Sequence, residues 1–322
     1  RNISPTSTIV LGGNMAASAE IILRKTEVDF CILGDGEVPM LELCSRLEKF
    51  GIVNKANFQD IKGIAYLENS NFIFTGHAIA LEGGLITFPD FKILEEDGSI
   101  NHYMPISPWW ADSNSHAQSL ELNKKRTATL QSTKGCVARC TFCHRFEKGY
   151  RTLAIDLFEE KIRELKETYG VSVITLGDEN FGSNKEHSNS VAEILNNFGM
   201  IWKVSGVRAR TVTLETLRFW KSKGCVDVVY GIESGSQTIL DIMQKNVTVE
   251  INDNAIEWTH QAGLDTVLQF VIGMPGETDS TIKETRDFIL RNLKNLYFPK
   301  GLPSNSISIN YCLLYTSDAA DD

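Results

Sequence analysis

From residue 127 onward, short apolar runs alternate with amphipathic stretches. Six runs have the length and apolar content of buried strands, at residues 128–132, 172–176, 201–207, 226–231, 266–272 and 306–313. The segments between them repeat apolar residues three and four positions apart, which is the period of a helix packed on one side. Regular alternation of such strands with helices predicts a parallel sheet. Six units predict a partial (βα)6 barrel, open on one side, over residues 127–322.

A smaller α/β pattern precedes this region. Residues 7–50 follow the order strand, helix, strand, helix, and both strand-like runs are apolar throughout, as in a parallel sheet covered on both faces. We predict an incomplete doubly wound, Rossmann-like module. Glycines end each run, at the edge where open α/β sheets bind ligands, but glycine is also the default residue of tight turns. Both interpretations stay open for Gly12, Gly13, Gly34 and Gly36.

Between the two patterns lie a predicted hairpin and a linker. Two strand-like runs around an Asn-Ser-Asn turn predict a hairpin over residues 62–76, which completes a first domain at residues 1–76. Residues 77–126 lose periodicity and are expected to be a linker, in which Trp109-Trp110 either caps a substrate pocket or packs between domains. The chain starts without Met and ends in an acidic tail in place of a last helix, so we expect a fragment of a longer protein.

The amino-acid composition limits the classes of molecule that the chain is expected to bind. The chain is 42% hydrophobic and 23% charged, which is ordinary for a globular protein. No apolar run approaches the ~20 residues that span a bilayer. The net charge of −9 argues against nucleic acid as the main partner and favours a small-molecule or lipid-like substrate. An odd number of cysteines without a secretory signal indicates a reducing compartment, so we expect a cytoplasmic protein.

Three cysteines stand close together after the first barrel strand. Cys136, Cys140 and Cys143 have the spacing C-x3-C-x2-C. Thiolates at this spacing can hold three irons of a cubic iron–sulfur cluster and leave the fourth iron open for chemistry. A structural zinc site completed by His144 is the alternative. The remaining cysteines lack such spacing and sit beside apolar residues, so we expect buried free thiols at Cys31, Cys44, Cys225 and Cys312.

Distinctive motifs follow the next four strands, at the strand ends where parallel barrels gather their functional groups. In chain order they are GDENF, VRAR, GIESGS and GMPGET. Arg208 and Arg210 stand at alternate positions, so we expect one to face into the barrel and Arg210 to form a surface ion pair. Purely structural alternatives are a helix cap at Asp178 and an ordinary strand-to-helix turn in GMPGET.

The cysteine loop followed by these motifs resembles the radical S-adenosylmethionine (SAM) superfamily, and within it the class with a cobalamin (B12)-binding domain. The family's CxxxCx(aromatic)C motif is matched, with Phe142 at the aromatic position. The resemblance implies a [4Fe–4S] cluster on the three cysteines, whose open iron chelates the amino and carboxylate groups of SAM. GDENF departs from the family's Gly-Gly-Glu but is close to the Asp-Asp-Asn-Phe of cobalamin-linked members.

The resemblance also implies which side chains bind SAM. Asp178 or Glu179, after Gly177, would accept hydrogen bonds from the SAM ammonium, and Arg208 would bind the carboxylate. GIESGS resembles the family's ribose-binding element, and GMPGET resembles the element that lies against the adenine. The residues implied there are Glu233, which would accept both ribose hydroxyls, Ser234, Gly273 and Pro275.

A second cofactor is implied by the N-terminal pattern. Its glycines resemble the second half of a cobalamin-binding module, although the family's early Asp-x-His-x-x-Gly signature is missing. The implied activity is reductive cleavage of SAM and hydrogen abstraction from a substrate, with cobalamin-dependent methyl transfer in many members. A flavodoxin- or ferredoxin-type protein would supply the electron. The alternatives are a tRNA methylthiotransferase-like enzyme and a non-enzymatic metal- or cobalamin-binding module.

Overall fold

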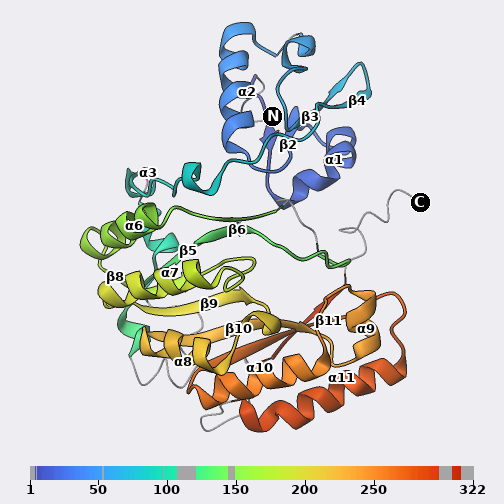
Figure 1. Ribbon diagram of the computed structural model, residues 1–322. Helices are drawn as coiled ribbons and strands as arrows, with labels where there is room; N and C mark the ends of the chain where they lie inside the picture. Colours follow the sequence, from blue (N-terminus) through green and yellow to red (C-terminus); the bar gives the residue numbers. More distant parts are fainter. Residues whose placement is uncertain are drawn as a thin grey trace. The chain divides into compact units, whose positions relative to one another are not determined.

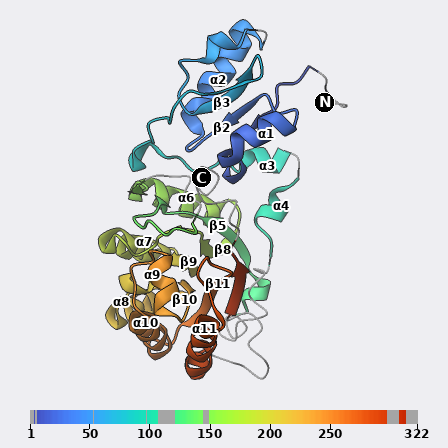
Figure 2. The same ribbon diagram turned by 90° about the vertical axis from the view of Figure 1, so that its right-hand side faces the viewer.

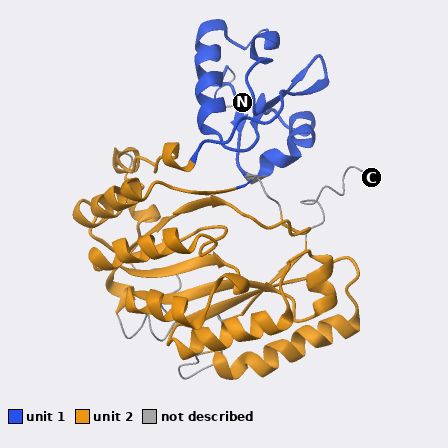
Figure 3. Ribbon diagram, viewed as in Figure 1, with its two compact units in different colours: residues 1–82, 144–149 blue, residues 83–143, 150–322 orange. Residues whose placement is uncertain are grey.

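The computed structural model describes residues 4, 6–52, 54–96, 98–106, 121–143, 149–296 and 307–312 (Figure 1). The chain divides into two compact units (Figure 3). Unit 1 comprises residues 1–82 and 144–149, and unit 2 comprises residues 83–143 and 150–322. Trp109, Trp110 and His144, singled out in the sequence, lie outside the described residues.

Unit 1 is a four-stranded sheet in the order β1-β2-β3-β4. Only β1 and β2 are parallel, and the predicted hairpin, β3 and β4, joins the same sheet antiparallel to β2. Cys31 packs with residues of one helix, α1, and its neighbours Phe30 and Ile32 pack with the other, α2, so both faces are covered, as predicted. The elements are β1 (Val10–Leu11), η1 (Asn14–Ser18), α1 (Ala19–Lys25), β2 (Phe30–Ile32), α2 (Glu37–Phe50), η2 (Lys55–Phe58), β3 (Ile64–Glu68) and β4 (Asn71–Phe74).

Unit 2 is built on a six-stranded sheet in the order β12-β11-β10-β9-β8-β5 (Figure 2). Every neighbouring pair is parallel, which confirms the predicted partial (βα)6 barrel. The strands are β5 (Arg126–Leu130), β8 (Val171–Leu176), β9 (Ile201–Val207), β10 (Cys225–Glu233), β11 (Asp265–Ile272) and β12 (Ile307–Tyr311). The register places the carboxyl ends of all six along one edge, so the motifs that follow them share that edge.

Helices cover one face of this sheet and enclose its main hydrophobic core. Several begin at a threonine whose hydroxyl accepts a hydrogen bond from the first turn, as Thr213, Thr248 and Thr278 do. The helices are α6 (Ile155–Glu167), α7 (Lys185–Asn197), η6 (Ala209–Thr211), α8 (Leu214–Ser222), α9 (Gln237–Ile242), α10 (Val249–Gln261), α11 (Asp279–Asn292) and η7 (Leu293–Asn295).

The predicted linker over residues 77–126 is, in its described part, largely a piece of unit 2. Phe91 is 8% exposed and Met104 is 1% exposed, and both belong to the core of that unit. Periodicity missed these contacts because Phe91 precedes and Met104 follows helices of only about one turn, α3 and α4. The elements here are η3 (Gly83–Leu85), α3 (Lys92–Glu96), α4 (Ile100–Tyr103) and η5 (Leu122–Lys124). A two-stranded ribbon, β6 (Thr133–Gly135) with β7 (Tyr150–Thr152), then flanks the cysteine loop.

Candidate active site

The cysteine loop is held by the carboxyl end of α9. Thr141 donates through its backbone N to the Met243 carbonyl at 3.0 Å and through Oγ1 to the Ile242 carbonyl at 3.1 Å. Phe142, the aromatic residue of the motif, is half-buried against the apolar cluster that contains Met243 and Met274. The loop is therefore anchored on a helix that follows it by about a hundred residues in the chain.

The three thiols differ in exposure but influence one another electrostatically. Cys140 is buried, Cys136 is half-buried and Cys143 is exposed. Desolvation raises the pKa of Cys143, and the Cys140 and Cys136 thiols raise it further. Within the described residues no three His, Cys, Asp or Glu side chains are close enough together to hold a metal ion. The donor set, three thiols on one short loop, suits a cluster with three protein ligands, and the ligand assignment stays a prediction.

Asp178 supports the turn that leads into the cysteine loop. Its Oδ1 accepts hydrogen bonds from the backbone N and the hydroxyl of both Ser132 and Thr133, at distances of 2.5–3.1 Å. Asp178 is 3% exposed, and burial raises its pKa to about 6 although these hydrogen bonds lower it. Among the described residues Oδ2 has no hydrogen-bond partner. Oδ1 thus stabilises the turn, whereas Oδ2 makes no hydrogen bond within the described residues.

Glu179, the alternative ammonium acceptor, is exposed beside the same loop. Its pKa is raised by desolvation and lowered by the charges of Arg151 and Lys134, and its own charge raises the pKa of Cys143. The backbone of Asp178 packs directly against Gly206, because a Cβ at Gly206 would lie 1.9 Å from the Asp178 carbonyl oxygen. Of the two carboxylates, Asp178 is held by hydrogen bonds of the chain, whereas Glu179 makes none within the described residues.

The buried ring of Phe181 anchors the turn after β8. Its ring packs between Trp202 and Trp220, with centroids 6.1 and 5.1 Å away, and is fully buried. Aromatic contacts of this kind contribute about 0.5–1.5 kcal/mol beyond burial. The GDENF motif is therefore an acidic turn held in place by its last residue. Gly177 lies at its start, where a Cβ would lie 3.4 Å from Thr129 Cγ2 and 3.8 Å from the Leu130 carbonyl oxygen.

The two arginines after β9 differ in depth but bind the same loop. Arg208 is 8% exposed and donates through Nη2 to the Lys245 carbonyl at 2.5 Å. Arg210 is exposed and donates through Nη1 to the Asn246 carbonyl at 3.1 Å. Arg210 is thus exposed, as predicted, but within the described part of the chain it makes this hydrogen bond and no ion pair. Strand alternation does not govern the pair because β9 ends at Val207 and the 3-10 turn η6 follows. The Nε of Arg208 has no partner among the described residues.

Glu233, at the end of β10, forms a buried ion pair that the sequence did not reveal. Its Oε1 lies 2.7 Å from the Nζ of Lys245, and both residues are 8% exposed. Glu233 has φ of 67°, a left-handed conformation that is uncommon outside glycine and often marks functional sites. A lysine in an unpatterned loop carries no sequence signal, so Lys245 could be found only from the fold. Charges of Lys245 and Arg208 lower the pKa of Cys140, which burial raises, so both cations lie near that thiol.

Two other residues predicted to contact SAM, Ser234 and Gly273, form hydrogen bonds within the chain. The Ser234 hydroxyl bonds to the Thr285 hydroxyl at 3.0 Å and accepts from the Ser236 backbone N. The Gly273 backbone N donates to Glu277 Oε2 at 2.5 Å, which closes the turn before α11. Pro275 is exposed in that turn. Function and turn remain compatible for these positions, and their adenine and ribose contacts stay predictions.

The glycines of unit 1 occupy turns at its strand ends. Gly13 and Gly34 have φ of 71° and 86°, so they need a left-handed backbone, whereas Gly12 and Gly36 do not. A Cβ at Gly12, Gly13 or Gly34 would meet nothing within 4 Å. Of the four cysteines expected to be buried, Cys44 is exposed, because α2 buries the preceding Leu43 instead. Cys31 and Cys225 are buried and Cys312 is half-buried.

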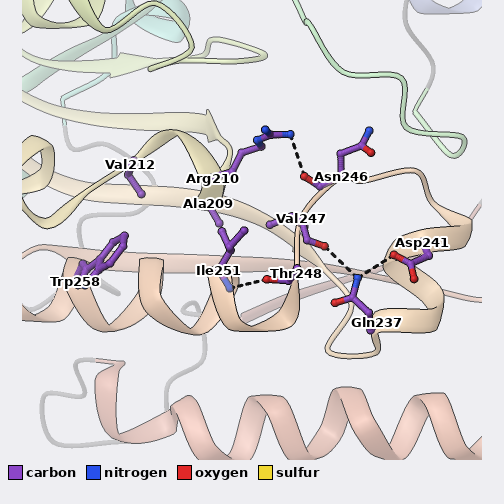
Figure 4. A pocket seen from close by; sticks show the side chains of 10 residues that line it. All are labelled: Ala209, Arg210, Val212, Gln237, Asp241, Asn246, Val247, Thr248, Ile251 and Trp258. Atoms are coloured by element: carbon purple, nitrogen blue, oxygen red, sulfur yellow. Dashed lines mark hydrogen bonds between the residues drawn. The ribbon is translucent and has the colours of Figure 1, made fainter.

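A separate cavity of about 510 Å³ lies on the side of Arg210 (Figure 4). Its wall includes Arg210, Asn246 and Trp258, and none of the residues predicted to bind the cluster or SAM lines it. The same loop thus presents Lys245 to the candidate site and Asn246 to this cavity.

A model of the Radical SAM superfamily matches residues 130–289. This region belongs to the radical SAM superfamily. It contains the three cysteines, Asp178, Arg208, Glu233 and Gly273. Membership implies an enzyme with a [4Fe–4S] cluster and SAM as cofactors, and a requirement for a reductant. No helix in the described ranges is long and apolar enough to cross a membrane.

Relatives of this chain include several longer proteins. The anaerobic magnesium-protoporphyrin IX monomethyl ester cyclase of Cereibacter sphaeroides is 25% identical over 88% of this chain and 44% of its own length. The cobalamin-dependent radical SAM enzyme OxsB, solved with aqua-cobalamin and SAM bound, has a TM-score of 0.68 and 20% identity, over 91% of this chain and 40% of its own. The methyltransferase TsrM of Kitasatospora setae, solved with cobalamin and a [4Fe–4S] cluster, has a TM-score of 0.66 and 15% identity, over 94% of this chain and 55% of its own length. The chain spans about half the length of these relatives or less.

Proposed function

We propose that this chain carries the catalytic core of a radical SAM enzyme in which Cys136, Cys140 and Cys143 hold the cluster. The observation that supports this most is the convergence of Arg208, Glu233 and the cysteine loop at one edge of the parallel sheet. When bound at these cysteines, the reduced cluster would supply one electron for the reductive cleavage of SAM, which would start hydrogen abstraction from the substrate.

The chain's own residues would orient SAM by complementary charge. Glu179, exposed beside Cys143, would accept hydrogen bonds from the ammonium, with the open Oδ2 of Asp178 as the alternative acceptor. Arg208 would donate to the carboxylate through Nε, which has no partner among the residues that the structure describes. Glu233 would accept the ribose hydroxyls through Oε2, since Oε1 is bound to Lys245. Hydrogen bonds to charged groups contribute roughly 1.5–3 kcal/mol each, enough to set the pose of a small ligand.

The substrate reaction that we propose is cobalamin-dependent methyl transfer. OxsB and TsrM share the fold over nine-tenths of this chain, unit 1 included, and both were solved with cobalamin. In unit 1 the left-handed turns at Gly13 and Gly34 follow strands β1 and β2, at the edge where open α/β sheets bind ligands. Glycine lets the backbone approach a large flat ligand closely.

The test is anaerobic reconstitution followed by analysis of iron, acid-labile sulfide and nucleoside products. We expect about four irons and four sulfides per chain, and 5′-deoxyadenosine from SAM when dithionite is added. Stoichiometric zinc without sulfide would contradict the proposal and favour a structural metal site. Cobalamin binding is measured separately, by the absorbance of the protein-bound fraction after gel filtration.

A further inference from the structure

Lys245 lies in the loop between α9 and α10 and contacts two of the side chains proposed to bind SAM, Glu233 and Arg208. Its ammonium is 2.7 Å from Glu233 Oε1, and its backbone carbonyl accepts from Arg208 Nη2 at 2.5 Å. Only 8% of the residue is exposed. A buried ammonium is costly unless it is paired, and here the Glu233 carboxylate offsets the desolvation of Lys245.

The backbone around Lys245 is held in an unusual conformation. Gln244 and Asn246, on either side, have φ of 50° and 52°, both left-handed. The bend is closed by hydrogen bonds from the Lys245 backbone N to the Leu240 carbonyl and from the Asn246 side chain to the Gln244 carbonyl. Such conformations persist only where the surroundings over-determine them. Here they direct the side chain of Lys245 to Glu233 and its carbonyl to Arg208.

The neighbouring residues leave room for the ion pair. A Cβ at Gly231 would lie 2.3 Å from Glu233 Oε1 and 3.1 Å from Lys245 Nζ, so only glycine fits there without displacing the pair. Lys245 Nζ is also 5.9 Å from the centroid of the Phe142 ring, in the cysteine loop. At that distance a cation interacts favourably with the ring face. One residue thereby contacts β10, the end of β9 and the cysteine loop.

We propose that Lys245 is a positioning residue for SAM, which fixes Glu233 through its ammonium and Arg208 through its carbonyl. The inference rests on the proposed function. With Oε1 held by Lys245, the carboxylate of Glu233 is fixed in orientation, and Oε2 is presented to the ribose hydroxyls. Without the ammonium, the buried carboxylate would lose this partner and would rotate toward another one.

The test compares the binding of SAM with that of its 2′-deoxyribose analogue to the cluster-loaded enzyme, by equilibrium dialysis. Loss of one hydroxyl bonded to a carboxylate should weaken binding roughly tenfold in the wild type. In Lys245→Met the difference should shrink to near unity, and Lys245→Arg should restore most of it. The matched control is Lys203→Met, which removes a lysine that is also buried in an ion pair, with Asp227 at 3.3 Å. In this control the tenfold difference should remain.

The possible negative results separate a failure of the proposed function from a failure of the role given to Lys245. If the wild type binds neither iron nor SAM, the proposed function is wrong. If the wild type discriminates between the ligands and Lys245→Met does so equally, the positioning role is wrong. Should Lys245→Met fail to fold, Gly231→Ala displaces the pair sterically and is expected to reduce the discrimination too. Full discrimination in a folded Gly231→Ala enzyme would likewise overturn the inference.

Discussion

The two units differ in the residues that stand at the carboxyl ends of their strands. In unit 2 the ends of β8, β9 and β10 carry charged side chains, Glu179, Arg208 and Glu233. In unit 1 the ends of β1 and β2 are marked by glycines, two of them with left-handed backbones. Side chains of opposite sign suit a small zwitterionic ligand whose charged groups must be oriented, whereas bare backbone suits close contact with a large surface. The same edge of an α/β sheet can thus serve two kinds of ligand.

The largest expected effect is the loss of the cluster in the cysteine variants. Replacing Cys136, Cys140 or Cys143 by Ala should each abolish iron and sulfide binding, because an open-site cluster has no spare protein ligand. Cys44→Ala is the control, since Cys44 is exposed on a helix of unit 1 and should leave iron content unchanged. Full iron loading in any of the three site variants would refute that ligand.

A pH effect on stability should distinguish Asp178 from the exposed carboxylates at the same edge. Burial raises its pKa from the ordinary 3.8 to about 6, so the folded chain binds this proton more tightly than the unfolded chain does. Its contribution to stability is present below about pH 4 and is lost as pH rises to about 6, by roughly 3 kcal/mol at most. The free energy of unfolding of the wild type, measured against that of Asp178→Asn across this range, should fall. Parallel pH profiles would show that Asp178 ionises normally.

Smaller effects are expected on SAM affinity. Glu233→Gln and Arg208→Ala should each weaken binding by about ten- to hundredfold, because each removes a charged partner, while iron content is preserved. Arg210→Ala should cost a few-fold at most, since Arg210 holds the same loop through an exposed hydrogen bond. SAM titrations on variants matched for cluster content measure this. A larger loss in Arg210→Ala than in Arg208→Ala would reverse the assignment of the two arginines.

The smallest effects belong to the glycines of unit 1. Gly34→Ala should destabilise the fold by about 1–2 kcal/mol, because alanine is strained at a φ of 86°. Gly12→Ala should be nearly neutral for stability, since its φ is not left-handed and a Cβ there meets nothing within 4 Å. Thermal denaturation of both variants checks the difference. If Gly12→Ala weakens cobalamin binding without changing stability, the backbone there contacts the ligand.

The regular parts of the fold could be predicted from the sequence because strand periodicity is local. The third barrel strand, Ile201–Val207, has the bounds predicted for it, and the motifs follow their strands as expected. The site itself was only partly predictable. The roles of Lys245 and Asp178 depend on partners far away in the chain, and the placement of Arg210 depends on a 3-10 turn that strand alternation does not predict.

The short helix α9 has a consequence for cooperativity. It spans only Gln237–Ile242, too short to be stable in isolation, and it holds the cysteine loop through Thr141 and leads directly into the Lys245 loop. Segments that depend on one another in this way open and close as one local unit of the native state. Ordering of the cysteine loop would therefore lower the local opening of the Lys245 loop, so that the proposed cluster binding and the proposed SAM site would be thermodynamically linked.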